Sequence, residues 1–242
     1  MRDNTFFKNG IEALGLSLSD EQYNQFEIFY DMLIEKNKVM NLTAITEYED
    51  VVTKHFVDSL LICKNQKIYE MLKKGCKVID IGTGAGFPGI PLKIAFPESE
   101  FVLMDSLNKR INFLCDVIGA LKLQKIKAIH ARCEEVARKP EYRECFDLCV
   151  SRAVAKTNSL AELCMPFVKV HGMFVPYKSG NIDEEFNEAK KAIGLLGGYS
   201  TGVEKYTVPN SDYERSFILI EKKSNTPGTY PRMGGKTMSK PL

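Results

Sequence analysis

Apolar residues recur at helical spacing in two stretches near the beginning of the chain. In residues 19–36 they fall on one face of a helix, and Ser19 followed by Gln22 matches the capping box that starts many helices. Residues 50–63 show similar spacing. Both stretches precede the first predicted strand, so the pattern predicts an N-terminal helical cap.

Beyond residue 75, short apolar runs alternate with helical patterns, which is typical of parallel strands joined by right-handed helical crossovers. Two last strands, at 203–208 and 216–220, have only a short polar link between them, and this predicts an antiparallel hairpin. The earlier strands are expected at 76–81, 100–105, 127–131, 146–150 and 172–177, and helices at 91–95, 109–121, 159–167 and 183–196. The chain is therefore expected to form an α/β fold, with a Rossmann-like, mostly parallel seven-stranded sheet that ends in the hairpin.

The pattern divides the chain into three parts. We assign 1–66 to the helical cap packed on the core, 67–223 to the Rossmann-like core and 224–242 to a basic C-terminal tail. A basic tail can attract phosphates, and it can equally be a solvated terminus. The formal net charge of the whole chain is only +2, whereas its last residues carry cations and no acid, namely Lys222, Lys223, Arg232, Lys236 and Lys240.

The composition is that of a globular protein, with 44% hydrophobic and 26% charged residues. No stretch approaches the roughly 18 to 20 apolar residues that a membrane span needs, and the first residues lead into no apolar signal core. The seven cysteines are odd in number and form no Cys-x-x-Cys pair, so we expect free thiols and neither a disulfide nor a metal site. We therefore expect a cytoplasmic protein with no membrane partner.

A cluster of glycines follows the first predicted strand, in residues 78–89 (Val-Ile-Asp-Ile-Gly-Thr-Gly-Ala-Gly-Phe-Pro-Gly). Glycine lets a backbone approach a ligand closely, and ligands bind at the carboxyl ends of strands in open α/β sheets. A P-loop is excluded, because no Gly-Lys-Ser/Thr follows. A dinucleotide site stays open, since residues 84–89 match Gly-x-Gly-x-x-Gly. The earlier start of the cluster at Gly82 and the missing N–H of Pro88 argue against that site.

An acidic residue followed by Gly-x-Gly-x-Gly resembles motif I of class I methyltransferases. Residues 80–86 have this form, Asp-Ile-Gly-Thr-Gly-Ala-Gly. S-adenosylmethionine carries no phosphate, and its amino-acid end needs backbone polar groups with a carboxylate nearby. A glycine loop that follows an acid supplies both. Asp105, at the end of the second predicted strand, can accept both ribose hydroxyls.

Longer blocks of the chain resemble one family of these enzymes, the small-subunit (16S) rRNA guanine-N7 methyltransferases, also called the glucose-inhibited division protein B family. The block at 78–92 is the longest, and Ser-Arg-Ala follows in the right order at 151–153. The chain departs from the family in its tail, where Met233 and Gly234 stand after Tyr-Pro-Arg and another basic residue is usual. The other similar blocks lie at 40–45, 55–60, 105–110, 131–135, 230–232 and 240–242.

The resemblance implies the class I S-adenosylmethionine-dependent methyltransferase fold, S-adenosylmethionine as the cofactor, and a set of site residues. Arg152 is implied to close the site near the cofactor and the target base, and it is the catalytic candidate. Contacts with the cofactor are implied for Asp80, Gly82, Gly84, Gly86, Phe87, Asp105, Ser106, Leu107, Cys133, Glu134 and Arg152. RNA contacts are expected from Arg132, Arg232, Lys236 and Lys240, together with Lys38 and Lys54.

The reaction implied by the family is methylation of guanine N7 in 16S rRNA, in the region of the 530 loop, by in-line transfer without a covalent intermediate. The sequence is compatible with it. Pyrimidine C5 methylation needs a Pro-Cys nucleophile, which the sequence lacks, and 151–154 do not match the Asn/Asp-Pro-Pro-aromatic segment of amine methyltransferases. Guanine N7 has a free lone pair and needs neither group. Because the product is cationic at N7, we expect Arg152 to contact a phosphate, the O6 edge or the cofactor carboxylate.

The expected partner is 16S rRNA, as naked RNA, in the small ribosomal subunit or in an assembly intermediate, and we expect the protein to be a monomer. Three alternatives stay open on the residues alone. They are an NAD-dependent oxidoreductase, a non-catalytic RNA-binding module of the same fold, and a methyltransferase of small molecules. An oxidoreductase would have His55, His130 and His171 as candidate proton donors, although His55 lies on an apolar face where packing explains it equally well.

Overall fold

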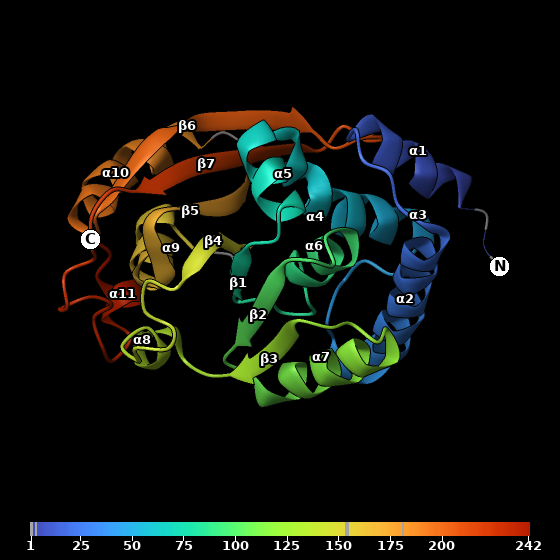
Figure 1. Cartoon of the computed structure of the whole chain (residues 1–242), viewed down its shortest axis with the longest axis horizontal. Coiled ribbons are helices and arrows are strands. Elements are labelled where there is room, and N and C mark those ends of the chain that lie inside the picture. Colours follow the sequence, from blue (N-terminus) through green and yellow to red (C-terminus); the bar gives the residue numbers. More distant parts are fainter. Residues whose placement is uncertain (1, 3, 153–154, 181) are drawn as a thin grey trace.

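The computed structural model describes residues 2, 4–152, 155–180 and 182–242, and its centre is a single seven-stranded sheet (Figure 1). The strand order is β3-β2-β1-β4-β5-β7-β6. The first five strands run parallel, and β7 pairs antiparallel with both β5 and β6. The strands are β1 (Lys77–Ile81), β2 (Glu100–Asp105), β3 (Ile126–His130), β4 (Phe146–Ser151), β5 (Val168–Ser179), β6 (Gly198–Thr207) and β7 (Glu214–Lys222). The predicted mostly parallel sheet with its final hairpin is confirmed.

The three last strands are longer than their apolar runs predicted. β6 begins at Gly198, five residues before the expected start, and its side chains are half-buried or exposed along the strand. It is held by its ladder with β7, which runs from the Gly198–Lys222 pair to the Thr207–Glu214 pair. A strand at the edge of a sheet buries few side chains, so its hydrophobic pattern understates its length.

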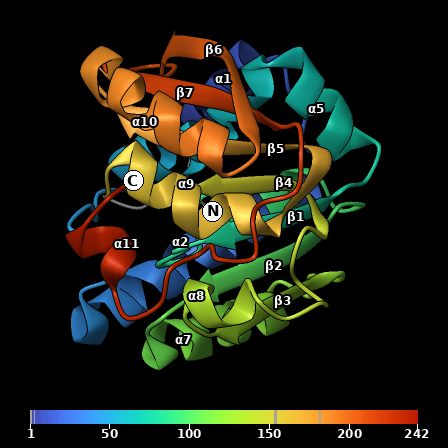
Figure 2. The ribbon, with the colours of Figure 1, turned by 90° about the vertical axis from the view of Figure 1, so that its left-hand side faces the viewer.

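Successive side chains of the central strands point to opposite faces of the sheet, and each face has its own core. On β1, Val78 belongs to one hydrophobic cluster and Ile79 to the other, and both are fully buried. The first face is covered by the helices before β1, by α6 (Gly89–Ala95) and by α7 (Asn108–Ala120). The second is covered by α8 (Cys133–Val136), α9 (Thr157–Cys164), a 3-10 turn (Met165–Phe167) and α10 (Asp183–Leu195) (Figures 1 and 2).

The first predicted helix is α2 (Asp20–Met40), and its predicted capping box is present. Gln22 N donates to Ser19 Oγ at 3.2 Å, and Ser19 N donates to Gln22 Oε1 at 2.8 Å. The helix extends four residues beyond its expected end. The preceding α1 (Thr5–Ala13) was missed, because a helix of nine residues that buries only Phe7, Gly10 and Ile11 gives too short a periodic pattern.

The second predicted helix, residues 50–63, is interrupted. It consists of α3 (Tyr48–Val51), a π-helical turn (Val52–Val57), α4 (Asp58–Leu60) and a 3-10 turn (Leu61–Lys64). All residues from 51 to 63 except Lys54 and His55 are buried, so the periodicity of the sequence did not reveal the change of helix type. π-helical turns inside helices occur frequently at functional sites, and this one carries Lys54 and His55.

The chain then forms α5 (Gln66–Lys73), which was also missed and which Asn65 caps through a bond from Ile68 N at 3.0 Å. After β7 the tail passes over the α9 side of the molecule and forms the short helix α11 (Lys236–Ser239) (Figure 2). Among the described residues, no helix has both the length and the apolar character to cross a membrane.

Candidate cofactor and substrate site

The predicted glycine loop joins β1 to α6 and lies against the end of β2. Gly82 N and Thr83 N both donate to Met104 O, at 2.9 and 3.1 Å. At Gly89 an added Cβ would lie 2.2 Å from Leu103 Cδ2 and 2.9 Å from Asp80 Oδ2, so close packing requires glycine there. Gly84 has a φ of +61° and open space beside it. The literal dinucleotide fingerprint therefore includes a glycine, Gly89, that serves helix–strand packing.

Asp80 lies behind this loop and is fully buried. Its Oδ2 accepts from Thr83 Oγ1 at 2.7 Å and from Gly89 N at 2.9 Å, which ties the two ends of the loop together. Its Oδ1 is buried without a hydrogen-bond partner among the described residues. Burial raises the pKa of Asp80 to about 7, and the bonds from Thr83 and Gly89 oppose that rise only in part.

Asp105 ends β2 beside the loop and is 4% exposed. Its Oδ2 accepts from Gly84 N at 3.0 Å and from Arg110 at 3.2 Å, and its Oδ1 accepts from Leu107 N at 2.9 Å. The Arg110 side chain is 37% exposed, so hydroxyl donors of a ligand can replace it at Asp105 and leave its guanidinium in solvent.

These elements enclose a cavity of about 810 Å³. It brings together most of the predicted cofactor residues, whereas Asp80 and Gly86 lie outside its lining. Segments that the sequence did not connect with the site also line it, from the cap, from α9 and from the tail. The lining consists of Leu42, Thr43, His55, Ile81, Gly82, Thr83, Gly84, Ala85, Phe87, Met104, Asp105, Ser106, Leu107, Arg110, Ala131, Arg132, Cys133, Glu134, Arg152, Ala155, Leu160, Leu163 and Met238.

Cys133 and Glu134 follow β3, as expected, and they begin α8. Burial raises the pKa of the Cys133 thiol well above its ordinary value, so the group is neutral and packs as a small apolar side chain. Among the described residues, no group of three His, Cys, Asp or Glu side chains is arranged to hold a metal ion.

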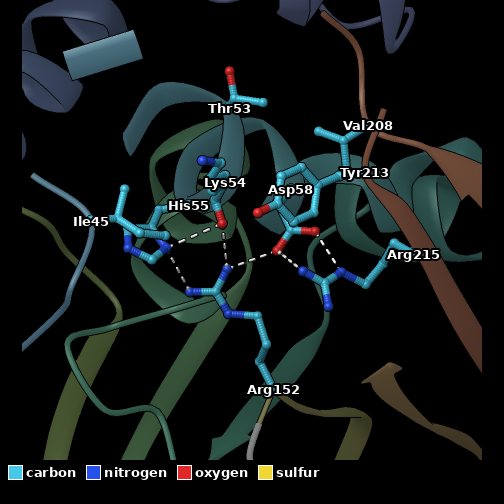
Figure 3. A pocket seen from close by; sticks show the side chains of 9 residues that line it. All are labelled: Ile45, Thr53, Lys54, His55, Asp58, Arg152, Val208, Tyr213 and Arg215. Atoms are coloured by element: carbon cyan, nitrogen blue, oxygen red, sulfur yellow. Dashed lines mark hydrogen bonds and ion pairs between the residues drawn. The ribbon is translucent and has the colours of Figure 1, made fainter. Parts of the chain in front are cut away.

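Arg152, directly after β4, is held by contacts with the π-helical turn (Figure 3). Its guanidinium donates to Lys54 O at 3.1 Å, to Asp58 Oδ2 at 2.8 Å and to His55 Nδ1 at 3.3 Å. It also lies 5.0 Å from the centre of the Phe87 ring, a cation–π distance. Its charge is therefore fixed in place at the wall of the cavity.

The imidazole of His55 stacks on the Phe87 ring, with 4.5 Å between the ring centres. Burial, together with the nearby Arg152 charge, lowers the pKa of His55 to about 3. The ring is thus neutral near neutral pH. Its Nε2 lies 2.8 Å from Thr43 Oγ1, and its Nδ1 lies 3.1 Å from Lys54 O and 3.3 Å from Arg152 Nη2.

Asp58 joins two arginines, and the sequence had not indicated this connection. It is fully buried and accepts from Arg215 Nε at 2.6 Å and Nη2 at 2.9 Å, in addition to the bond from Arg152. Arg215 comes from β7, more than 150 residues away in the sequence. His55 and Asp58 lie in a block that resembles the family, whereas nothing in the hairpin pattern singles out Arg215.

The two arginines border a second cavity of about 270 Å³, which shares His55 and Arg152 with the first (Figure 3). It is formed by the cap, the end of β4 and the hairpin. Its lining carries three cationic side chains and one carboxylate. The residues are Ile45, Thr53, Lys54, His55, Asp58, Arg152, Val208, Tyr213 and Arg215.

The predicted RNA contacts fall in different places. Arg132 lines the larger cavity, and Lys236 and Lys240 are exposed in the tail. Arg232 differs, because its guanidinium forms two bonds of 2.8 and 2.6 Å with the fully buried Glu162 of α9. Its charge is therefore paired with a buried carboxylate of the protein itself. In the Ser-Arg-Ala block, Ala153 lies outside the described residues, as does Val154.

Known proteins that are similar to this chain identify its family. The model of the family described as rRNA small subunit methyltransferase G matches residues 22–215. A protein named ribosomal RNA small subunit methyltransferase G from Lachnoclostridium phytofermentans is 55% identical over 242 residues, covering 100% of this chain and 98% of the relative. One of the same name from Clostridium novyi is 47% identical over 231 residues, covering 96% and 93%.

Solved structures show the same fold at low sequence identity. A mutant form of MtNAS aligns with a TM-score of 0.55 and 13% identity, over 84% of this chain and 75% of that one. TYW2 of M. jannaschii, solved in complex with AdoMet, aligns with a TM-score of 0.50 and 17% identity, over 65% and 75%. These likenesses establish the class I methyltransferase fold. The match of the family model and the identity to whole-length relatives establish that the chain belongs to the rRNA small subunit methyltransferase G family.

Proposed function

We propose that this protein transfers the methyl group of S-adenosylmethionine to N7 of a guanine in the 16S rRNA of the small ribosomal subunit. Membership of the family supports the reaction. The observation that carries it in this chain is a cavity of about 810 Å³, bordered by the glycine loop, by Asp105 and by Arg152, that adjoins a second, cationic cavity. The larger cavity has a size and lining suited to the cofactor, and the smaller cavity has a positive charge suited to RNA.

The residues present fit S-adenosylmethionine. The loop at Gly82 and Gly84 leaves backbone open to the cavity, and Asp105 presents a carboxylate to a ribose. The buried Oδ1 of Asp80, which has no partner in the described chain, is an acceptor suited to an ammonium group. When bound, the cofactor supplies a methyl group that is already activated by a positively charged sulfur.

The task of the protein is then to place N7 in line with that methyl group and to exclude water. We assign the cavity bordered by Tyr213 and Arg215 to the incoming nucleotide, because it adjoins the cofactor cavity at His55 and Arg152. Tyr213 is 50% exposed and offers a ring for stacking on a base.

The charges around the junction suit a product that is cationic at N7. His55 stays neutral and neither removes nor delivers a proton, which N7 does not require. The carboxylate of Asp58 offsets the charge of Arg152 at 2.8 Å, so that Arg152 can donate to O6 or to a phosphate with little repulsion of the product. Arg152 is accordingly the catalytic candidate.

The finer assignments belong to the same proposal. The target lies in the 530 loop region, the protein acts in the cytoplasm as a monomer, and Arg132, Lys236 and Lys240 contact RNA phosphates. Asp80, Gly82, Gly84, Gly86, Phe87, Asp105, Ser106, Leu107, Cys133, Glu134 and Arg152 form the cofactor site, in which Gly86 shapes the loop and Asp80 both ties the ends of the loop together and offers Oδ1 to the ammonium group of the cofactor.

The test is incubation of the protein with S-adenosylmethionine labelled in its methyl group and three substrates, namely naked 16S rRNA, 30S subunits and a precursor particle. We expect label in 7-methylguanosine after nuclease digestion, within a fragment that contains the 530 loop. Gly84→Asp, which introduces a side chain into the cavity, should abolish transfer. Label in another nucleoside would contradict the N7 assignment, and calorimetric binding of NAD without binding of S-adenosylmethionine would contradict the cofactor.

A further inference from the structure

The C-terminal tail is attached to the core by side chains that bind its backbone. Arg143 donates to Thr226 O at 2.8 Å and to Tyr230 O at 3.1 Å. Arg138 donates to Pro231 O at 2.7 Å. Both arginines belong to the segment between α8 and β4, which lies on the same side of the sheet as the tail (Figures 1 and 2). A solvated terminus would not be bonded in this way.

A second set of contacts fixes α11 itself. Arg232 pairs with the buried Glu162 and also donates to Lys240 O at 2.8 Å. Ser159 Oγ of α9 donates to Thr237 O at 2.9 Å, and Thr237 is fully buried. A buried carboxylate needs a partner charge, so the pair of Arg232 and Glu162 locks the tail onto α9.

This anchoring places one tail residue, Met238, at the cofactor cavity. Met238 lines the cavity together with Leu160 and Leu163 of α9, and these three form an apolar part of the lining. The polar and charged side chains of the lining come from other segments, namely the cap, the glycine loop, the end of β2 with the start of α7, the start of α8 and the end of β4. Met238 is 55% exposed, although both of its neighbours on the chain, Thr237 and Ser239, are held by hydrogen bonds.

We infer that Met238 is a cofactor-binding residue that covers the adenine ring. The inference rests on the proposed use of S-adenosylmethionine. The cofactor has a polar amino-acid end, a polar ribose and one flat aromatic group, and the apolar wall matches only the last of these. A methionine sulfur makes favourable contacts with aromatic rings and adapts to their shape.

The chain offers a matched control. Met233 stands in the same tail and is 46% exposed, and it is absent from the described lining of the cavity. The experiment compares wild type, Met238→Ala, Met238→Leu and Met233→Ala by calorimetric titration with S-adenosylhomocysteine and with methylthioadenosine, which lacks the amino-acid end. Thermal unfolding of each variant checks that the fold is intact.

We expect Met238→Ala to weaken the binding of both ligands by the same factor, roughly 3- to 10-fold. Met238→Leu should retain most of the affinity, and Met233→Ala should bind like wild type. Equal affinities for Met238→Ala and Met233→Ala would overturn this inference and leave the proposed cofactor in place. A loss for S-adenosylhomocysteine without a loss for methylthioadenosine would overturn the adenine contact. Wild type that binds neither ligand would overturn the proposed cofactor, and the inference with it.

Discussion

The two ends of the cofactor cavity are built in different ways. The glycine-loop end comes from one continuous segment, residues 78–89, and its shape is made by backbone. At the arginine end, side chains join three distant segments, because Asp58 of α4 binds both Arg152, at the end of β4, and Arg215 of the hairpin strand β7. A segment that makes a site by itself leaves a motif in the sequence, whereas a site assembled from distant side chains does not.

The largest effect is expected at the arginine end, from Asp58→Asn. The substitution leaves the side chains of Arg152 and Arg215, each 16% exposed, without their shared carboxylate. Removing one partner of a buried ion pair typically costs about 3 to 5 kcal/mol of unfolding free energy. We expect a loss of that size in urea denaturation, and loss of methyl transfer. Asp50→Asn is the control, because that carboxylate is 48% exposed and its pair with Lys54 should contribute below about 1 kcal/mol.

A smaller effect is expected at the backbone-made end, from Gly89→Ala. The added Cβ would lie 2.2 Å from Leu103 Cδ2, so the strand or the loop must shift. Overpacking of a buried site costs about 1 to 3 kcal/mol, measured as the change in unfolding free energy. At Gly119, on α7, an added Cβ meets nothing within 4 Å, so Gly119→Ala should stabilise by up to about 1 kcal/mol. Equal results for the two substitutions would show that the loop adapts and that its glycines are not needed for packing.

The buried carboxylate of Asp80 makes the stability of the loop end depend on pH. Its pKa is raised by burial to about 7, above the ordinary value of 3.8, so the folded state retains a proton that the unfolded state has lost. Stability contributed by this group is therefore present below about pH 4 and is lost as pH rises towards 7. The unfolding free energy of Asp80→Asn, relative to that of wild type, should rise by about 2 kcal/mol as the pH is raised from 5 to 7. Denaturation at each pH measures this difference. Saturating S-adenosylhomocysteine should reduce this gain, because its ammonium group stabilises the charged carboxylate. A gain independent of pH would contradict the assignment.

The smallest effect concerns charges outside both ends of the cavity. Lys236 and Lys240 are exposed in the tail, and each is expected to neutralise about one RNA phosphate. Alanine at either position should lower the slope of log affinity against log salt by roughly 0.7 to 0.9, as measured by filter binding to 16S rRNA at several salt concentrations. Lys191, exposed on α10, is the matched control. An unchanged slope would show that these lysines are solvated and do not contact RNA phosphates.

Much of the fold could be predicted because the central parallel strands β1, β2 and β4 are buried on both faces. Segments such as 101–104 and 148–150 are continuous apolar runs, and turn residues separate them from the helices. The missed elements have weaker signals. α1 is short and α5 has few buried residues. The π-helical turn of Val52–Val57 lies in a stretch that is buried except at Lys54 and His55, so its change of period is not visible.

The same distinction holds for individual site residues. Asp105 could be predicted as a site residue because it lies at the carboxyl end of a parallel strand, where ligands bind in open α/β sheets. Arg232 was expected to contact RNA because a basic tail can attract phosphates. No local pattern in the sequence indicates that Arg232 pairs with the buried Glu162. Met238 lies in the same tail and has no motif, and only the anchoring of α11 on α9 brings it to the cavity.

The sequence by itself determined the α/β sheet, the glycine loop, Asp105 and the family, because each of these depends on residues that are close together along the chain. Only the tertiary structure decided that one carboxylate, Asp58, joins Arg152 to Arg215, that the cap supplies His55 to the cavity, and that the tail is part of its wall. These contacts join segments up to about 160 residues apart. Their free energy comes from burying charges and apolar surface against partners that no local pattern records.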